Sequence, residues 1–145
     1  MLIDANILLY AVDQRSRQHD VAVAWLTEQL NGPRRVGIPW QSLTAFLRIS
    51  THPRASESPL TPNEAWSHVA DWLAADPVWT PAPTERHAEV LGGLIATHEV
   101  RGNLIPDVDL VALAIEHGLT ICSADSDFAR FTEVRWTNPL AAPSV

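Results

Sequence analysis

Apolar and polar positions follow two different periodicities along this chain. Short continuous apolar runs predict buried strands at 1–4, 36–38, 78–80, 119–122 and 134–136. Longer segments, in which apolar residues recur every three or four positions, predict helices at 5–12, 19–30, 39–50, 61–75, 84–100, 106–115 and 128–131. Strands that alternate with helices are typical of a mostly parallel sheet covered on both faces. We therefore expect an α/β fold.

Local sequence signals mark the beginnings of several of these helices. Thr61 and Glu64 have the spacing of a capping box, with a proline between them in the first helical turn. Pro106 suits the first turn of a helix, where the carboxylate of Asp107 would meet unpaired backbone N–H groups. Thr84 is expected to cap the helix that follows it.

Length and composition favour a single folded domain, residues 1–145. The chain has 145 residues, 46% of them hydrophobic, which is enough for one core and too few for two ordinary domains. No apolar run approaches the roughly 20 residues of a membrane span, and the first residues lack the basic flank of a signal peptide. The lone Cys122 excludes an internal disulfide and is expected to be a buried thiol. These features are typical of a cytosolic protein.

The charge balance bears on the choice of partners. A formal net charge of −7 argues against a nucleic-acid binder, because such proteins usually present a basic surface. The argument weakens if several carboxylates gather around divalent cations that neutralise them. Every basic residue is an arginine, whose guanidinium suits phosphate contacts. Arg48, Arg86 and Arg130 either face such an acidic site, where they would contact nucleic-acid phosphates, or are solvated surface residues.

Three carboxylates, those of Asp4, Asp107 and Asp125, stand where an apolar segment ends or begins. Ligands of parallel sheets gather beyond the carboxyl ends of the strands, and two of these residues follow predicted strands. Any one of the three is equally well explained as a helix cap or a turn residue. Together they predict a site for Mg²⁺, or for Mn²⁺, because hard cations bind a few carboxylates together with the phosphates of a substrate.

Other polar residues lie close to these three in the sequence. Asp127 is in a predicted turn, where it is either a further metal ligand or the cap of the short helix that follows. Asp109 is two residues from Asp107, about 200° around a helix, so we expect it to point away and to be structural. Asn6 is expected to hydrogen-bond Asp4 and orient it.

Histidine and tryptophan add no further candidate site. The six histidines have no zinc-binding spacing with one another or with Cys122, and we expect them at the surface. The six tryptophans fall mostly on helical stripes or in strands, which favours core packing over stacking with nucleic-acid bases.

Four segments in a fixed order carry a resemblance to a known family. They are 2–8 (LIDANIL), 46–49 (FLRI), 103–107 (NLIPD) with Ala112 and Ala114 beyond it, and 123–131 (SADSDFARF). This ordered set spans almost the whole chain. It resembles the PIN-domain ribonucleases of the VapC type, which are the toxins of bacterial VapB–VapC toxin–antitoxin pairs.

The resemblance implies a PIN-like three-layer sandwich, with a mostly parallel central sheet between helices. It implies that Asp4, Asp107 and Asp125 hold Mg²⁺ or Mn²⁺, and that RNA phosphodiester bonds are cleaved by a metal-activated water. It also implies a homodimer in the cytoplasm of a prokaryote. A small VapB-type antitoxin would inhibit the enzyme by covering the active site with its C-terminal segment.

The chain departs from the family pattern in one helix. Members commonly supply a further acid just before the segment that corresponds to 46–48, whereas 39–50 contains neither Asp nor Glu. Gln41 and Ser42 are the nearest polar substitutes, and we expect them to hydrogen-bond around the metal ligands without adding charge. A less negative site should hold one metal better than two. We therefore expect an active enzyme with weak metal affinity.

Two other functions remain open from the sequence. A phosphatase or phosphotransferase with an aspartyl nucleophile typically needs a second acid two residues after the first, and Asn6 at that position counts against it. A catalytically decayed PIN-like module would bind RNA or a protein partner without cleavage. Metal-dependent cleavage of RNA separates these functions.

Overall fold

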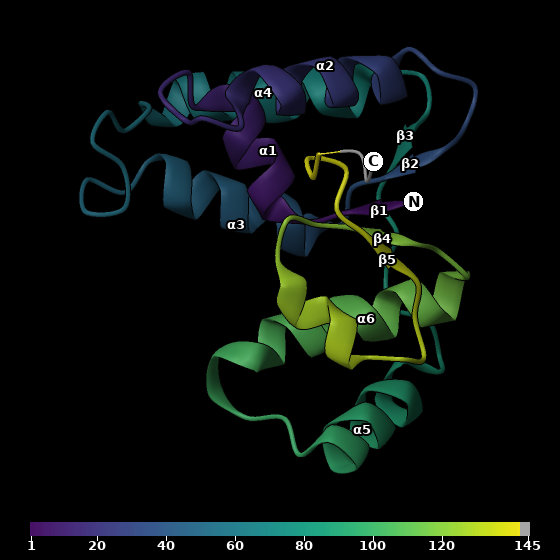
Figure 1. The fold of residues 1–145 in the computed structure, drawn as a ribbon. Coiled ribbons are helices and arrows are strands. Elements are labelled where there is room, and N and C mark those ends of the chain that lie inside the picture. The colour runs from purple at the N-terminus through teal and green to yellow at the C-terminus, as the bar shows by residue number, and fades with distance from the viewer. Residues whose placement is uncertain (143–145) are drawn as a thin grey trace.

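The computed structural model describes residues 1–142 and contains an entirely parallel five-stranded sheet. Its strands are β1 (Leu2–Ile3), β2 (Val36–Gly37), β3 (Val78–Trp79), β4 (Ile121–Cys122) and β5 (Trp136–Thr137), in the spatial order β3-β2-β1-β4-β5. The α/β fold with a parallel sheet is thereby confirmed (Figure 1). The prediction of a single domain covers residues 1–145, of which 143–145 lie outside the described residues.

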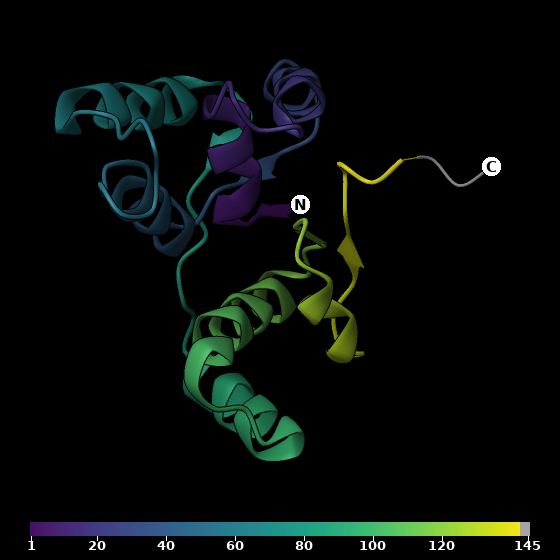
Figure 2. The same ribbon diagram turned by 60° about the vertical axis from the view of Figure 1, so that its left-hand side comes forward.

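Helices cover both faces of the sheet and make a three-layer sandwich, as Figures 1 and 2 show. One face carries α1 (Ala5–Val12), α2 (His19–Leu30), α3 (Trp40–Ser50) and α4 (Pro62–Ala74). The other carries α5 (His87–His98) and α6 (Ile105–His117), with the 3₁₀ helices η1 (Gly102–Leu104) and η2 (Ser126–Arg130) beside α6. Within residues 1–142, no helix has the length and apolar character needed to cross a bilayer.

Two neighbouring residues of β1 show how the sheet separates two hydrophobic cores. Successive side chains of a strand point to opposite faces, and both Leu2 and Ile3 are fully buried. Leu2 packs in the core beneath α6, whereas Ile3 packs in the core beneath α1 and α3. In that second core the rings of Phe46 and Trp72 pack edge to face, with 4.8 Å between their centroids. Helices α3 and α6 therefore belong to different cores.

The two predicted N-terminal caps had different outcomes. The capping box is present: Glu64 N–H donates to Thr61 Oγ1 (3.2 Å), and Thr61 N–H donates to Glu64 Oε1 (3.0 Å). The prediction for Thr84 is wrong, because α5 begins only at His87. The Thr84 hydroxyl instead donates to Glu116 Oε1 at 2.6 Å. Its Oγ1 also accepts the Arg86 N–H at 3.1 Å, so this threonine bonds both the turn before α5 and a carboxylate of α6.

Some aromatic and histidine side chains differ from their predicted environments. Trp72 is buried as expected, whereas Trp40 and Trp66 are 48% and 49% exposed. His52 is exposed as expected, but His87 is largely buried between two carboxylates. Hydrophobic spacing finds the apolar stripe of a helix, but the acidic partners of a histidine lie on other elements and leave no periodic signal.

Candidate functional site

The candidate site lies where the strand order changes direction. From β1 the chain proceeds through β2 to β3 on one side, and then returns to place β4 and β5 on the other side. Such a switch point leaves a crevice beyond the carboxyl ends of the two central strands. Asp4 directly follows β1, and Asp125 follows β4 by three residues. The backbone bond from Asp4 N–H to Cys122 C=O, 3.0 Å, holds these two strand ends together.

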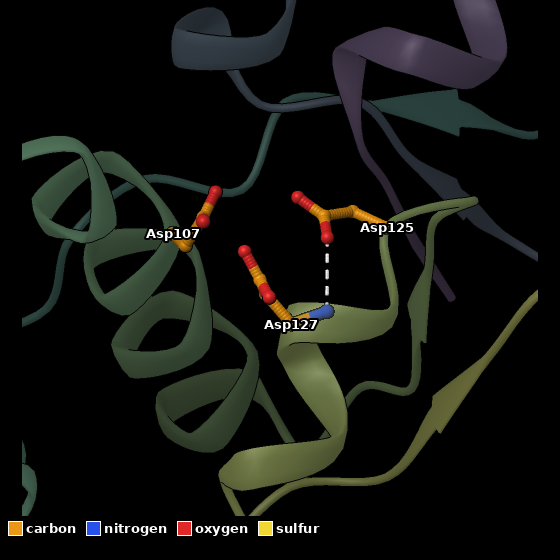
Figure 3. Close-up of side chains that lie close together, drawn as sticks. All are labelled: Asp107, Asp125 and Asp127. Atoms are coloured by element: carbon orange, nitrogen blue, oxygen red, sulfur yellow. Dashed lines mark hydrogen bonds between the residues drawn. The ribbon is translucent and has the colours of Figure 1, made fainter.

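Three carboxylates converge near these strand ends (Figure 3). They belong to Asp107 in the first turn of α6 and to Asp125 and Asp127 at the start of η2. One carboxylate oxygen of each lies within 4.8 Å of the others. Asp125 accepts the N–H of Asp127 at 2.9 Å and is itself the cap of η2. Asp127 is therefore not the cap of this helix, and its carboxylate joins the cluster, hereafter the acidic trio.

Asp4 lies beside the trio, and both of its oxygens are engaged. Its Oδ1 accepts the N–H of Ala5 at 2.8 Å and caps α1. Its Oδ2 accepts hydrogen bonds from the Ser123 hydroxyl (2.8 Å) and from the Asn6 amide (3.3 Å). Asn6 thus makes the contact that an orienting residue would make. Metal ligation by Asp4 remains a prediction.

Sequence reasoning missed Ser123, the residue that joins the two strand ends. Its side chain is fully buried, donates to Asp4, and accepts hydrogen bonds from Asn6 (2.9 Å) and from the Asp125 N–H (3.0 Å). A hydroxyl has one donor and two acceptor positions, so all its hydrogen-bonding capacity is used. Its position immediately after β4 was the available signal, because β4 pairs with β1.

Crowding of negative charge perturbs the carboxylates of the site. Burial, together with the charges of Asp4, Asp125 and Asp127, raises the pKa of Asp107 from 3.8 to about 6. Burial also raises the pKa of Asp4, although hydrogen bonds from Ser123 and Ala5 oppose the shift. Such repulsion destabilises the site unless a cation neutralises it. The oxygen donors and their convergence therefore fit a hard divalent metal ion.

Neither Gln41 nor Ser42 of α3 hydrogen-bonds the trio. Ser42 is buried and donates to the carbonyl of Ile3 at 2.7 Å, which anchors β1 just before Asp4. Gln41, with its amide oriented by its hydrogen-bonding partners, donates to Asp109 Oδ2 and accepts the Leu110 N–H at 3.3 Å. We expected both beside the metal ligands, but their partners lie one residue before Asp4 and on the far side of α6.

Asp109 faces away from the trio, as its helical offset predicted. Its Oδ1 lies 2.7 Å from Nε2 of His87, and the other ring nitrogen, Nδ1, lies 2.5 Å from Glu116 Oε2. When both ring nitrogens donate to these carboxylates, the imidazole carries a positive charge. Burial of the ring lowers the pKa of His87, but the bonds to Glu116 and Asp109 outweigh it and raise this pKa overall.

The three arginines predicted to bind RNA are all exposed and occupy different parts of the molecule. Arg130 ends η2 three residues after Asp127, and residues three apart in a 3₁₀ helix share a face. Arg48 lies in the last turn of α3. The backbone of Arg86 bonds to Thr84 at the end of α6 distant from Asp107, so the structure does not bring it to the trio.

The single thiol has no part in this site. Cys122 is buried in β4, and burial raises its pKa to about 11. It therefore stays protonated at neutral pH and packs as an apolar residue, as expected.

Comparisons with known proteins identify the family. The PIN domain model matches residues 1–134. Ribonuclease VapC37 of Mycobacterium tuberculosis is 44% identical over 140 residues, 97% of each chain, and ribonuclease VapC33 of the same species is 39% identical over 137 residues, 94% of this chain and 96% of the relative.

Solved structures share the fold at lower sequence identity. M. tuberculosis VapC20, described as a sarcin–ricin loop cleaving toxin, has a TM-score of 0.66 at 18% identity, over 92% of this chain and 98% of its own. VapBC2 from Rickettsia felis, bound to a promoter DNA fragment, has a TM-score of 0.65 at 16% identity, over 94% and 96%. The family model and the close relatives together show that this chain belongs to the PIN domain family and, within it, to the VapC ribonucleases.

Proposed function

We propose that this chain is the toxin of a type II toxin–antitoxin pair and is an endoribonuclease that hydrolyses RNA phosphodiester bonds with Mg²⁺. The observation that carries the proposal is the convergence of Asp107, Asp125 and Asp127 at the switch point of a PIN-type sheet. Relatives named VapC ribonucleases at up to 44% identity support the activity. The chain would form a single PIN domain and would act in the cytoplasm of a bacterium.

The chain's own carboxylates would hold the metal. Asp107, Asp125 and Asp127 each turn one oxygen toward a common point, and Asp4 adds negative charge beside them. A bound Mg²⁺, or Mn²⁺ in its place, supplies Lewis acidity toward the scissile phosphate and lowers the pKa of a coordinated water. Asp4 is kept in one orientation by Ser123 and Asn6, which limits reorganisation of the site during the reaction.

Two of the exposed arginines would bind the RNA backbone. Arg130 shares a face of η2 with Asp127, and Arg48 shares a face of α3 with Gln41. A guanidinium in either place can donate paired hydrogen bonds to a phosphate that flanks the scissile one. Such contacts position RNA without selecting its sequence.

The site should hold one metal ion more tightly than two. Helix α3 contributes no carboxylate, and Gln41 is turned toward Asp109. A second ion would therefore depend on the phosphates of bound RNA. We expect cleavage activity together with weak affinity for Mg²⁺ in the absence of RNA.

Both competing functions are less well supported. A decayed module would not be expected to retain three convergent carboxylates, or an Asp107 whose pKa is raised by burial and by the neighbouring carboxylates. An aspartyl-phosphate mechanism lacks its second acid, because Asn6 occupies that position and its amide bonds Asp4, Ser123 and the Ala124 N–H.

We also propose a VapB-type antitoxin and a second copy of this chain as partners. Among the solved neighbours are VapBC2 of R. felis and FitAB, each bound to a DNA fragment, the latter with a TM-score of 0.68 at 16% identity. These names describe those proteins, and the partners of this chain are inferred from family membership.

Cleavage of total bacterial RNA by the purified protein tests the proposed activity. Mg²⁺, Mn²⁺ and EDTA are compared, and Asp107→Ala, Asp127→Ala and Asp4→Ala are assayed beside the wild type. We expect discrete metal-dependent fragments from the wild type alone, because loss of any one of these carboxylates, as a ligand or as a neighbouring charge, weakens metal binding and removes most of the activity. RNA that stays intact with folded wild-type protein in both metals would reject the nuclease and favour the decayed module.

A further inference from the structure

A chain of polar contacts joins α3 to α6 and continues to α5. Gln41 donates to Asp109, Asp109 contacts Nε2 of His87 at 2.7 Å, and Nδ1 of His87 contacts Glu116 at 2.5 Å. We call these four residues the α3–α6 latch. They are separate from the acidic trio, and the proposed chemistry does not use them.

One end of the latch is firmly anchored. The side chain of Glu116 is fully buried, and its Oε1 accepts both the hydroxyl (2.6 Å) and the N–H (2.8 Å) of Thr84. The ring of His87 is 19% exposed, and Asp109 is 36% exposed. Because a buried carboxylate is costly unless it is paired, this set of contacts should persist as a unit. The carboxylate of Asp109 is therefore held in a fixed position that faces α3.

The latch joins two layers that share no apolar core. Leu43 and Phe46 of α3 lie in the core on one face of the sheet, whereas Leu110 and Leu113 of α6 lie in the core on the other. Each helix is therefore packed on the sheet from its own face, and Ser42 also bonds α3 to the Ile3 carbonyl of β1. The Gln41 contacts to Asp109 and to the Leu110 N–H connect the two helices directly, beyond the end of the sheet.

The Gln41 contacts also relate Arg48 of α3 to Asp107 of α6. Asp107 lies on α6 two residues before Asp109, and Arg48 lies on α3 seven residues after Gln41, about two helical turns along the same face. A change in the spacing between α3 and α6 therefore moves Arg48 relative to the carboxylates. The trio itself does not move, because it is built on α6 and η2, which share one core.

We infer that Gln41 and His87 are positioning residues that hold α3 at the distance from the acidic trio at which RNA is bound. This inference rests on the proposed ribonuclease function. Neither residue contacts the trio. Loosening the latch should weaken RNA binding while the metal site and the chemical step stay intact.

The test compares Gln41→Ala and His87→Ala with a matched control, His98→Ala. His98 also lies on α5 and pairs with a carboxylate, Glu133 Oε1 at 2.8 Å, but this pair does not reach α3. Initial rates with a mixed-sequence RNA oligonucleotide give KM and kcat. Calorimetry gives the Mg²⁺ affinity of the RNA-free protein, and circular dichroism checks folding.

We expect both latch variants to raise KM about fivefold, with kcat and Mg²⁺ affinity within about twofold of the wild type. His98→Ala should change none of these quantities. A KM equal to that of the control would overturn the inference, because the latch would then have no effect on RNA binding. A parallel loss of Mg²⁺ affinity would also overturn it, because the latch would then support the metal site itself. Should His87→Ala fail to fold, Gln41→Ala at the partly exposed end of the latch carries the test.

Amide hydrogen exchange separates failure of this inference from failure of the proposed function. If the wild type does not cleave RNA, the ribonuclease proposal fails and KM is undefined. The latch is then judged by exchange at residues 40–44, which should be faster in Gln41→Ala than in His98→Ala. Equal exchange in the two variants would show that the latch does not hold α3.

Discussion

The hydroxyl of Ser123 donates a hydrogen bond of 2.8 Å to Asp4, a residue 119 positions away in the sequence. The bond connects the carboxyl end of β4 with that of β1, where the strand order changes direction. Asn6 and the backbone of Asp125 donate to the same hydroxyl. One small buried side chain thus connects, by hydrogen bonds, the segments that carry Asp4 and Asp125, two of the four carboxylates of the site.

Ser123→Ala should destabilise the protein by about 1–3 kcal/mol, because it leaves buried polar partners of the hydroxyl unsatisfied. The pKa of Asp4 should rise further, since the Ser123 bond opposes the effect of burial. Urea denaturation measures the first effect, and carbon-13 NMR of the Asp4 carboxyl measures the second. Ser67→Ala on the exposed side of α4 is the control. A stability equal to that of this control would show that Ser123 does not organise the site.

Asp107→Asn should stabilise the metal-free protein at neutral pH while weakening Mg²⁺ binding. The folded-state pKa of Asp107, about 6, is above its ordinary value of 3.8, so the folded state binds the extra proton between these values. Its contribution to stability therefore falls as pH rises from 3.8 to 6. Urea denaturation in EDTA at about pH 4 and pH 7 measures the free energy of unfolding of both proteins. The variant should exceed the wild type by more at pH 7 than at pH 4. A gain that does not change with pH would contradict the shifted pKa.

His87→Ala should cost more stability in mildly acidic than in alkaline solution. The raised folded-state pKa means that the stabilisation by charged His87 is complete below its ordinary pKa, about 6.5, and is lost as pH rises through the folded-state value. Unfolding free energies of wild type and variant at about pH 6 and pH 9 measure the difference. An equal cost at both values would mean that the ring is not charged between Glu116 and Asp109.

Gln41→Glu should leave the Mg²⁺ affinity within about twofold of the wild type, because position 41 faces Asp109 and not the trio. The substitution removes the donor to Asp109 and places two carboxylates together, so stability should fall by about 1 kcal/mol. Calorimetric titration with Mg²⁺ and urea denaturation measure the two quantities. An affinity at least tenfold higher would place residue 41 among the metal ligands.

The sequence by itself determined the local elements and the class of fold. The capping box of Thr61 and Glu64 and the proline before Asp107 act over three or four residues, so they could be identified without tertiary contacts. Alternation of short apolar runs with helical stripes gave the parallel α/β sheet. The ordered motifs around Asp4, Asp107 and Asp125 carried the resemblance to the PIN family, which the family model confirmed.

Only the tertiary structure decided which side chains share a site. It placed Asp127 in the trio by making Asp125 the cap of η2, and it directed Gln41 to Asp109. It also gave Ser123 its partner on another strand. Capping and hydrophobic periodicity act between near neighbours and leave a signal in the sequence. Hydrogen bonds between distant polar residues leave none, because they depend on how the strands and helices are brought together in the folded chain.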